Sequence, residues 1–175
     1  MPDMNTKNQK TAEETRILRR LRVVLAGFIV GLVLSGLTAF PLEWELNLLA
    51  RWLGIAPGDY SGLRFWIATV QGGLRETYAH YPFMAYGTDW LAFAHLVIAT
   101  AFIGPWRDPA KNVWIFEWAM IACVGILPLA LICGPLRGIP FYWRLIDCSF
   151  GVVGIVPLWL CRRDALRLER LRNIE

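Results

Sequence analysis

The chain has 175 residues, of which 56% are hydrophobic and 18% are charged, and its mean hydropathy is +0.42. Because a soluble domain is about 45–50% apolar and about 25% charged, and because the apolar excess here lies in long runs, the composition excludes an ordinary soluble domain and indicates membrane-spanning helices. The net charge of +4 comes from basic residues that gather at the two termini beside apolar runs, which favours topology signals and contact with acidic lipids over nucleic-acid binding.

Residues 1–22 are polar and basic, and the uncharged run 23–40 is the first predicted span. At about 1.5 Å rise per residue, this run nearly crosses a hydrocarbon core of about 30 Å. A cleaved signal peptide would have a shorter apolar region and a small-residue cleavage site, so we expect an uncleaved anchor. Gly27, Gly31 and Ser35 recur every four residues. This spacing either lets another helix approach closely or reflects only the frequency of glycine in membrane helices.

Residues 41–87 are predicted to form a cap at the outer membrane interface. Four leucines recur there at helical spacing: Leu42, Leu46, Leu49 and Leu53. This pattern predicts an amphipathic helix that lies in the interface and ends at Pro57-Gly58-Asp59. A second short stretch, 63–71, is expected to end at Gly72-Gly73, and the sequence leaves open whether 60–75 dips into the membrane.

Three more apolar runs, 88–105, 113–133 and 140–161, complete four predicted spans within a membrane domain of residues 23–161. A basic tail, 162–175, is expected to continue as a charged helix. The sequence therefore predicts an all-α fold: an integral membrane four-helix bundle with amphipathic interfacial helices between the first and second spans.

The basic residues also predict the orientation. With four spans, the two termini and the turn 106–112 share one side of the membrane. Thirteen of the 18 lysines and arginines lie on that side. Since cytoplasmic segments carry the excess of Lys and Arg, both termini are predicted to be cytoplasmic and the cap periplasmic. We expect a multi-pass protein of the bacterial inner membrane.

The four cysteines are interpreted as packing residues, because no CxxC pair and no Cys/His spacing of a zinc site occurs. They are Cys123, Cys133, Cys148 and Cys161. We expect no metal site.

Three charged residues within the predicted spans are candidates for a functional role, because charges there are costly. Glu117 is near the inner interface, and we interpret it as structural or as reaching the water there. Arg144 and Asp147 are three residues apart and share a helix face. They form either an internal pair that fixes helix docking or a polar pocket open to the periplasm.

A candidate ligand site follows from these positions. Asp89, His95, Arg137, Arg144 and Asp147 are all placed in the outer part of the membrane by the predicted topology. A convergent polar cluster beneath an aromatic cap is the usual ligand-site hypothesis for such a protein.

The two histidines suggest an alternative. His95 lies about two turns into the second span, with Ala92 and Ala99 on nearly the same face. Small neighbours leave room for a close-packed helix or for the flat ring of a haem or chlorin with His95 as axial ligand. His80, in the cap, would be the second haem ligand.

The stretches YPFMAYGTDWLAFAHLVIA and RGIPFYWRLIDCSFG resemble small uncharacterised bacterial four-span inner-membrane proteins. The resemblance covers roughly residues 75–163. It implies a bacterial four-span protein and no activity.

Three functional hypotheses remain open. The first is a non-enzymatic accessory or small-ligand or lipid-binding protein with a periplasm-facing site. The second is a haem- or chlorin-binding electron-transfer subunit that uses His95. The third is a lipid- or quinone-acting enzyme that uses Arg144, Asp147 and His95. No P-loop, HExxH or Ser-His-Asp arrangement is present, so the sequence favours the first without deciding on catalysis. The expected partners are the lipid bilayer and a homo-oligomer or larger membrane complex, with no nucleic acid.

Overall fold

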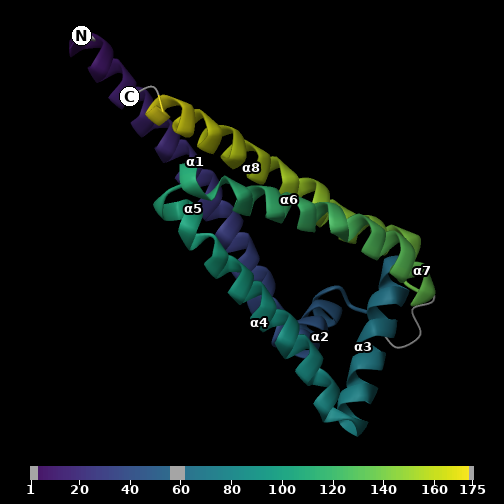
Figure 1. Cartoon of the computed structure of the whole chain (residues 1–175). Helices are drawn as coiled ribbons and strands as arrows, with labels where there is room; N and C mark the ends of the chain where they lie inside the picture. Colours follow the sequence, from purple (N-terminus) through teal and green to yellow (C-terminus); the bar gives the residue numbers. More distant parts are fainter. Residues whose placement is uncertain (1–3, 56–61, 174–175) are drawn as a thin grey trace. The chain divides into compact units, whose positions relative to one another are not determined.

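The computed structural model describes residues 4–55 and 62–173, and every element in that part of the chain is helical (Figure 1). The prediction of an all-α protein is therefore confirmed. Residues 56–61, which include the predicted break at Pro57-Gly58-Asp59, lie outside the described part, as do the first three and last two residues.

Four helical stretches are long and apolar enough to cross a membrane. They are Asn8–Ala39, Pro82–Arg107, Ala110–Leu136 and Phe141–Arg172. Each covers one predicted span to within one residue, which supports a multi-pass membrane protein.

The chain divides into two compact units, which are described separately. Unit 1 comprises Met1–Val30 and Thr100–Glu175, and unit 2 comprises Gly31–Ala99. The helix α1 (Met4–Ala39) belongs to both, and so does α4 (Tyr86–Ala101).

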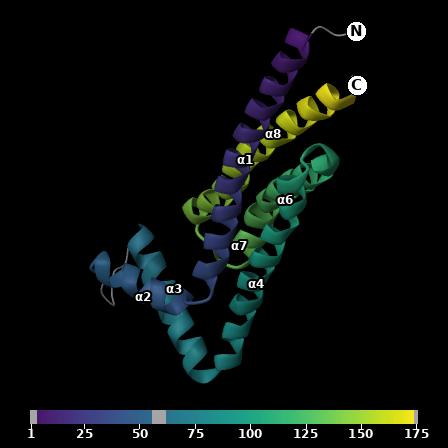
Figure 2. The same ribbon diagram turned by 90° about the vertical axis from the view of Figure 1, so that its left-hand side faces the viewer.

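Unit 1 contains the first part of α1 and the elements that follow α4. These are α5 (Ile103–Arg107), the short η2 (Ala110–Asn112), α6 (Val113–Pro128), the π-helical η3 (Leu129–Cys133), α7 (Gly134–Leu136) and α8 (Phe141–Asn173). The helices α6 and α8 lie side by side in both views (Figures 1 and 2). The tail is part of α8, so the predicted charged helix is confirmed.

Glycines of α8 set the close approach of α6 and α8. An ideal Cβ placed on Gly151 would lie 2.5 Å from the carbonyl oxygen of Cys123, and one on Gly154 would lie 3.0 Å from the Cys123 Sγ. Any larger residue at these positions would push the two helices apart. Cys123, Cys148 and Cys161 are buried and free, as expected for packing residues, whereas Cys133 is exposed.

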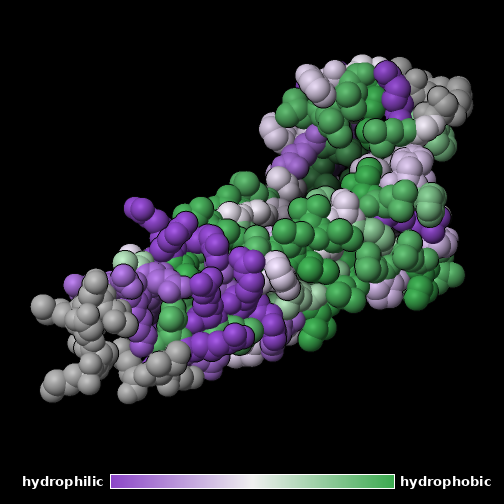
Figure 3. Space-filling model, turned by 90° about the horizontal axis from the view of Figure 1, so that it is seen from above, coloured by the Kyte–Doolittle hydropathy of each residue, from purple (hydrophilic) through white to green (hydrophobic). Residues whose placement is uncertain are grey.

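The core of unit 1 is formed by large apolar side chains from four segments. Leu21 and Leu25 of α1, Phe102, Phe116 of α6 and Leu158 of α8 are almost completely inaccessible to solvent. Hydrophilic side chains gather over the free ends of α1 and α8 and give way to hydrophobic ones farther along these helices (Figure 3). This change of surface marks where a membrane would begin.

Unit 2 holds the predicted cap. The helix α2 (Leu42–Trp52) confirms the amphipathic helix, and Glu43 and Arg51 lie at the ends where the helix dipole favours their charges. The helix α3 (Gly62–His80) packs against α2, and the Gln71 Nε2 donates a 2.7 Å hydrogen bond to the Asn47 Oδ1. From α3 the chain turns through η1 (Pro82–Ala85) into α4, and α3 and α4 diverge from this turn (Figure 2).

The expectation that the second stretch ends at Gly72-Gly73 is wrong, because α3 continues through both glycines to His80. Each glycine costs about 1 kcal/mol of helix stability relative to alanine. This cost is small compared with the free energy gained by extending a helix that reaches 19 residues. The residues from Leu74 onward include good helix formers, so the helix does not stop.

Candidate functional site

The turn between α6 and α8 has an irregular backbone, and a pocket lies against it. Pro128 ends α6, and because proline has no N–H to donate and its ring clashes with the preceding turn, the backbone widens into the π-helical η3. After α7, Gly138 adopts a left-handed φ of 70° and turns the chain back toward α8. Short π-helical segments of this kind occur frequently at functional sites.

A pocket of about 240 Å³ lies against this segment. Its wall is mostly apolar and comes from Ile126, Leu129, Ala130 and other residues of α6, η3 and α7. Arg137 and Asp147 also line it, so a cationic and an anionic group face one small cavity. The structure thus brings two of the five predicted site residues together.

Arg144 lies next to this pocket and packs on Gly134. An ideal Cβ on Gly134 would lie 2.5 Å from the Arg144 Cδ, and the guanidinium carbon lies 5.2 Å from the centroid of the Phe141 ring. The Arg144 Nε is buried and has no hydrogen-bond partner among the described residues. Arg144 therefore owes its position to packing and a cation–π contact, with part of its polar head unsatisfied.

Arg144 and Asp147 do not form the internal pair that was one of the two interpretations of their spacing. Within residues 4–55 and 62–173, no ion pair or hydrogen bond joins them, and Asp147 is half-buried without a basic partner. Arg137 also has no acidic partner in that part of the chain. The polar-pocket interpretation fits this geometry better.

The other two predicted site residues, Asp89 and His95, belong to α4 in unit 2. Asp89 is half-buried in the first turn of α4, where the helix dipole favours a carboxylate, and it lines a separate pocket of about 320 Å³ with aromatic residues such as Tyr86 and Trp90. His95 donates from its Nδ1 to the carbonyl oxygen of Leu91 at 2.8 Å. This hydrogen bond leaves the Nε2 with a lone pair for a ligand.

The helix α1 packs against the backbone side of His95. Gly36 of α1 approaches so closely that a Cβ there would lie 3.0 Å from the Ala92 carbonyl oxygen and 3.0 Å from the His95 Cβ. Ala92 is completely buried. His80 is exposed and donates from its Nδ1 to the Glu76 carbonyl oxygen at 3.0 Å, and in the described part of unit 2 the two histidine rings make no contact. The close-packed helix is thus the better interpretation of the small neighbours of His95.

The sequence interpretation missed the ionic network that joins the charged ends of α1 and α8. The Asp164 side chain is only 2% exposed and accepts two hydrogen bonds from Arg20, at 2.8 Å from Nε and 2.5 Å from Nη2. Glu117 accepts from Arg162 at 2.8 Å, which agrees with its predicted structural role. Outer pairs join Arg167 to Glu13 and Arg172 to Glu14. The signal that the sequence offered was a carboxylate directly after two arginines, at residues 162–164.

The sequence matches no protein family model, and neither a curated protein nor a solved structure matches the chain. The functional interpretation therefore depends on the residues and their geometry.

Proposed function

We propose that this chain is a non-enzymatic protein of the bacterial inner membrane that binds a small polar ligand or a lipid headgroup in the pocket of Arg137 and Asp147. The observation that carries the proposal is the gathering of three ionisable side chains, Arg137, Arg144 and Asp147, without a charged partner among the described residues, around a π-helical segment. The charge count supports placing this pocket on the periplasmic side and both termini in the cytoplasm.

The proposal follows from the cost of charge in a membrane. An ionisable side chain at membrane depth costs several kcal/mol, and such side chains normally pair or line a functional cavity. Here Asp147 and Arg137 face the same pocket without neutralising each other through a direct contact. A bound ligand would supply the missing partners.

The chemistry of the pocket defines the ligand class. Arg137 favours an acidic group such as a carboxylate or phosphate, and Asp147 favours an amine or hydroxyl donor. The apolar wall of η3 and α7 suits a short hydrocarbon segment. The ligand would therefore be zwitterionic or amphiphilic, as a small metabolite or a lipid headgroup can be.

The test is native mass spectrometry of protein released from its own membranes in mild detergent. We expect wild-type protein to retain one ligand mass, and Asp147→Asn and Arg137→Gln to lose most of it. Arg75→Gln, a change at an exposed residue of α3, is the control and should retain the ligand. Equal retention by all four proteins would contradict the proposal.

Arg144 distinguishes a packing role from a binding role. If it only packs, Arg144→Met should preserve both the thermal midpoint and the ligand, because methionine fills much of the same volume. If its unsatisfied head contributes to binding, the midpoint should be preserved and the ligand lost. We expect the second result.

Haem binding by His95 is kept as the second candidate because its Nδ1 hydrogen bond leaves the Nε2 with a lone pair. The test is a visible absorption spectrum of protein purified from cells with ample haem. A Soret band that disappears in His95→Ala, but not in His80→Ala, would establish one axial ligand. A flat spectrum above roughly 300 nm would remove this candidate.

A further inference from the structure

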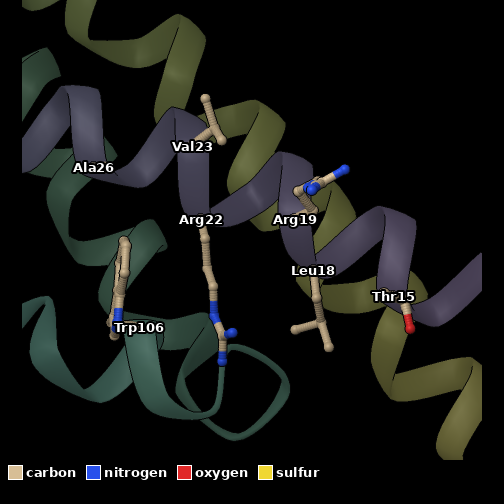
Figure 4. Close-up of a pocket in the computed structure, with 7 residues that line it drawn as sticks. All are labelled: Thr15, Leu18, Arg19, Arg22, Val23, Ala26 and Trp106. Atoms are coloured by element: carbon tan, nitrogen blue, oxygen red, sulfur yellow. The ribbon is translucent and has the colours of Figure 1, made fainter.

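A second groove lies between α1 and α5 (Figure 4). It has a volume of about 440 Å³ and is formed by α1 residues between Thr15 and Ala26 together with Trp106 of α5. Its surface is mainly apolar, with Leu18, Val23 and the indole ring of Trp106 among its walls. Figure 4 shows Leu18 and Arg22 extending from α1 toward the side on which Trp106 lies.

Two arginines at this groove have no acidic partner within the described residues. Arg22 places its guanidinium carbon 6.0 Å from the centroid of the Trp106 ring, and Arg19 lines the same groove. Several other arginines of this end of unit 1 do have carboxylate partners: Arg20, Arg162, Arg167 and Arg172. The positive charge of the groove is therefore not neutralised by any carboxylate in the described part of the chain.

The groove also lies at the boundary between the polar and apolar parts of α1. Arg22 is the last charged residue before the uncharged run, and Val23 is the first residue of that run. Trp106 has an amphipathic indole, which membrane proteins place at the level of the lipid headgroups. A ligand in this groove would thus have its polar end beside Arg19 and Arg22 and its apolar end beside Val23 and Ala26.

We infer that this groove binds one anionic phospholipid of the leaflet that faces the basic ends of α1 and α8. The phosphate lies between Arg19 and Arg22, and an acyl chain follows Val23 and Ala26 past the Trp106 ring. Charge complementarity and the polar-to-apolar order of the lining match the order of headgroup and chain in a phospholipid. The site uses none of the residues of the Arg137 pocket, so each proposal can fail without the other.

The test measures the binding of phosphatidylglycerol and phosphatidylcholine to the full chain in mild detergent by native mass spectrometry. We expect wild-type protein to retain phosphatidylglycerol in preference to phosphatidylcholine. The double variant Arg19→Gln, Arg22→Gln should lose about 25-fold in affinity for phosphatidylglycerol, because each arginine near an anionic headgroup contributes roughly a fivefold factor and the two factors multiply.

The matched control is Arg16→Gln, Arg170→Gln, which removes two exposed arginines from the same end of unit 1 but leaves the groove intact. It should retain the affinity to within about twofold. An equal loss in both double variants would show a non-specific effect of net charge and overturn the site. Unchanged thermal midpoints would show that both variants are folded.

A third variant tests the apolar part of the groove without changing the charge. Ala26→Phe should fill the space of the acyl chain and lower phosphatidylglycerol retention while both arginines remain. Inorganic phosphate at about ten times the lipid concentration should not displace the lipid, because the acyl chain contributes to its binding. Displacement by phosphate, or full retention in Ala26→Phe, would overturn the lipid assignment in favour of a free-anion site.

Discussion

Asp164 is buried in the described part of the chain, and its two carboxylate oxygens are directed at Arg20. A buried carboxylate is tolerated only when its hydrogen-bonding capacity is met, and here one guanidinium meets it with two bonds. Arg163 lies farther away, with its Nε 3.6 Å from the Asp164 Oδ1. The pair therefore fixes the position of α1 on α8 at one point.

Arg20→Gln is predicted to destabilise the protein because it leaves the buried Asp164 carboxylate without its main partner. We expect a loss of about 1–3 kcal/mol, below the roughly 3–5 kcal/mol of a fully buried pair, since the Arg20 side chain is 52% exposed. The measurement is thermal unfolding in detergent. Arg19→Gln, one residue earlier, is the control and should shift stability by less than about 0.5 kcal/mol.

At the scale of elements, Gly151 fixes the position of α8 on α6, as the Arg20–Asp164 pair fixes the position of α1 on α8. Two membrane helices gain little from hydrophobic burial against each other, because lipid is equally apolar, and their contact depends on close packing. The backbone oxygen of Cys123 lies where a Cβ of residue 151 would be. The helix pair therefore depends on the absence of a side chain at this position.

Gly151→Ala is predicted to destabilise the α6–α8 pair by about 1–3 kcal/mol, because the obstructing atom is backbone and α6 must shift. Gly125→Ala in α6 is the matched control, since nothing lies within 4 Å of a Cβ there. The measurement is the thermal midpoint of both variants in the same detergent. Equal midpoints for the two variants would show that α6 and α8 can move apart to accommodate the added methyl group without loss of stability.

The glycine pair of α3 leads to the opposite prediction. Gly72 and Gly73 lie inside a helix, and a Cβ on either would meet no atom within 4 Å. Gly72→Ala and Gly73→Ala should each stabilise the protein by up to about 1 kcal/mol through the lower entropy of the unfolded chain. Unfolding followed by circular dichroism measures the effect, and a loss of stability would show an unrecognised role for backbone flexibility.

The elements differ in how well the sequence predicted them. Long uncharged runs such as 23–40 were found because the membrane imposes a length and composition that few other structures share. The Gly27 and Gly31 spacing was less informative, since a Cβ at either residue would meet no described atom within 4 Å and Gly36 makes the close approach instead. Which glycine contacts a neighbour depends on the rotation of the helix, which one sequence does not specify.

The candidate site was predicted only in part. Arg137 and Asp147 line one pocket as expected, but the buried partner of Arg20 was not foreseen. Residues 20 and 164 are far apart in sequence, and only the packing of α1 on α8 brings them together. Ionisable residues within a span are visible from composition, whereas pairings between distant segments require the fold.

At the scale of the whole molecule, the distribution of basic residues predicts that both termini lie on the cytoplasmic side. A reporter that folds only in the cytoplasm should be active when fused after Glu175, and a reporter active only in the periplasm should be active when fused after Gly138. The positions are chosen because one follows the basic tail and the other lies in the turn between α6 and α8. The reverse pattern of activities would invert the orientation.

The ionic network at the ends of α1 and α8 has a consequence for the response of the protein to salt. At about 1 M salt the screening length is about 3 Å, so exposed pairs such as Arg167–Glu13 and Arg172–Glu14 lose most of their attraction. The Arg20–Asp164 pair is screened much less because its carboxylate is buried. Rising ionic strength should therefore separate the ends of α1 and α8, beginning at the termini. The separation should not extend beyond the Arg20–Asp164 pair, which holds the two helices together at high salt.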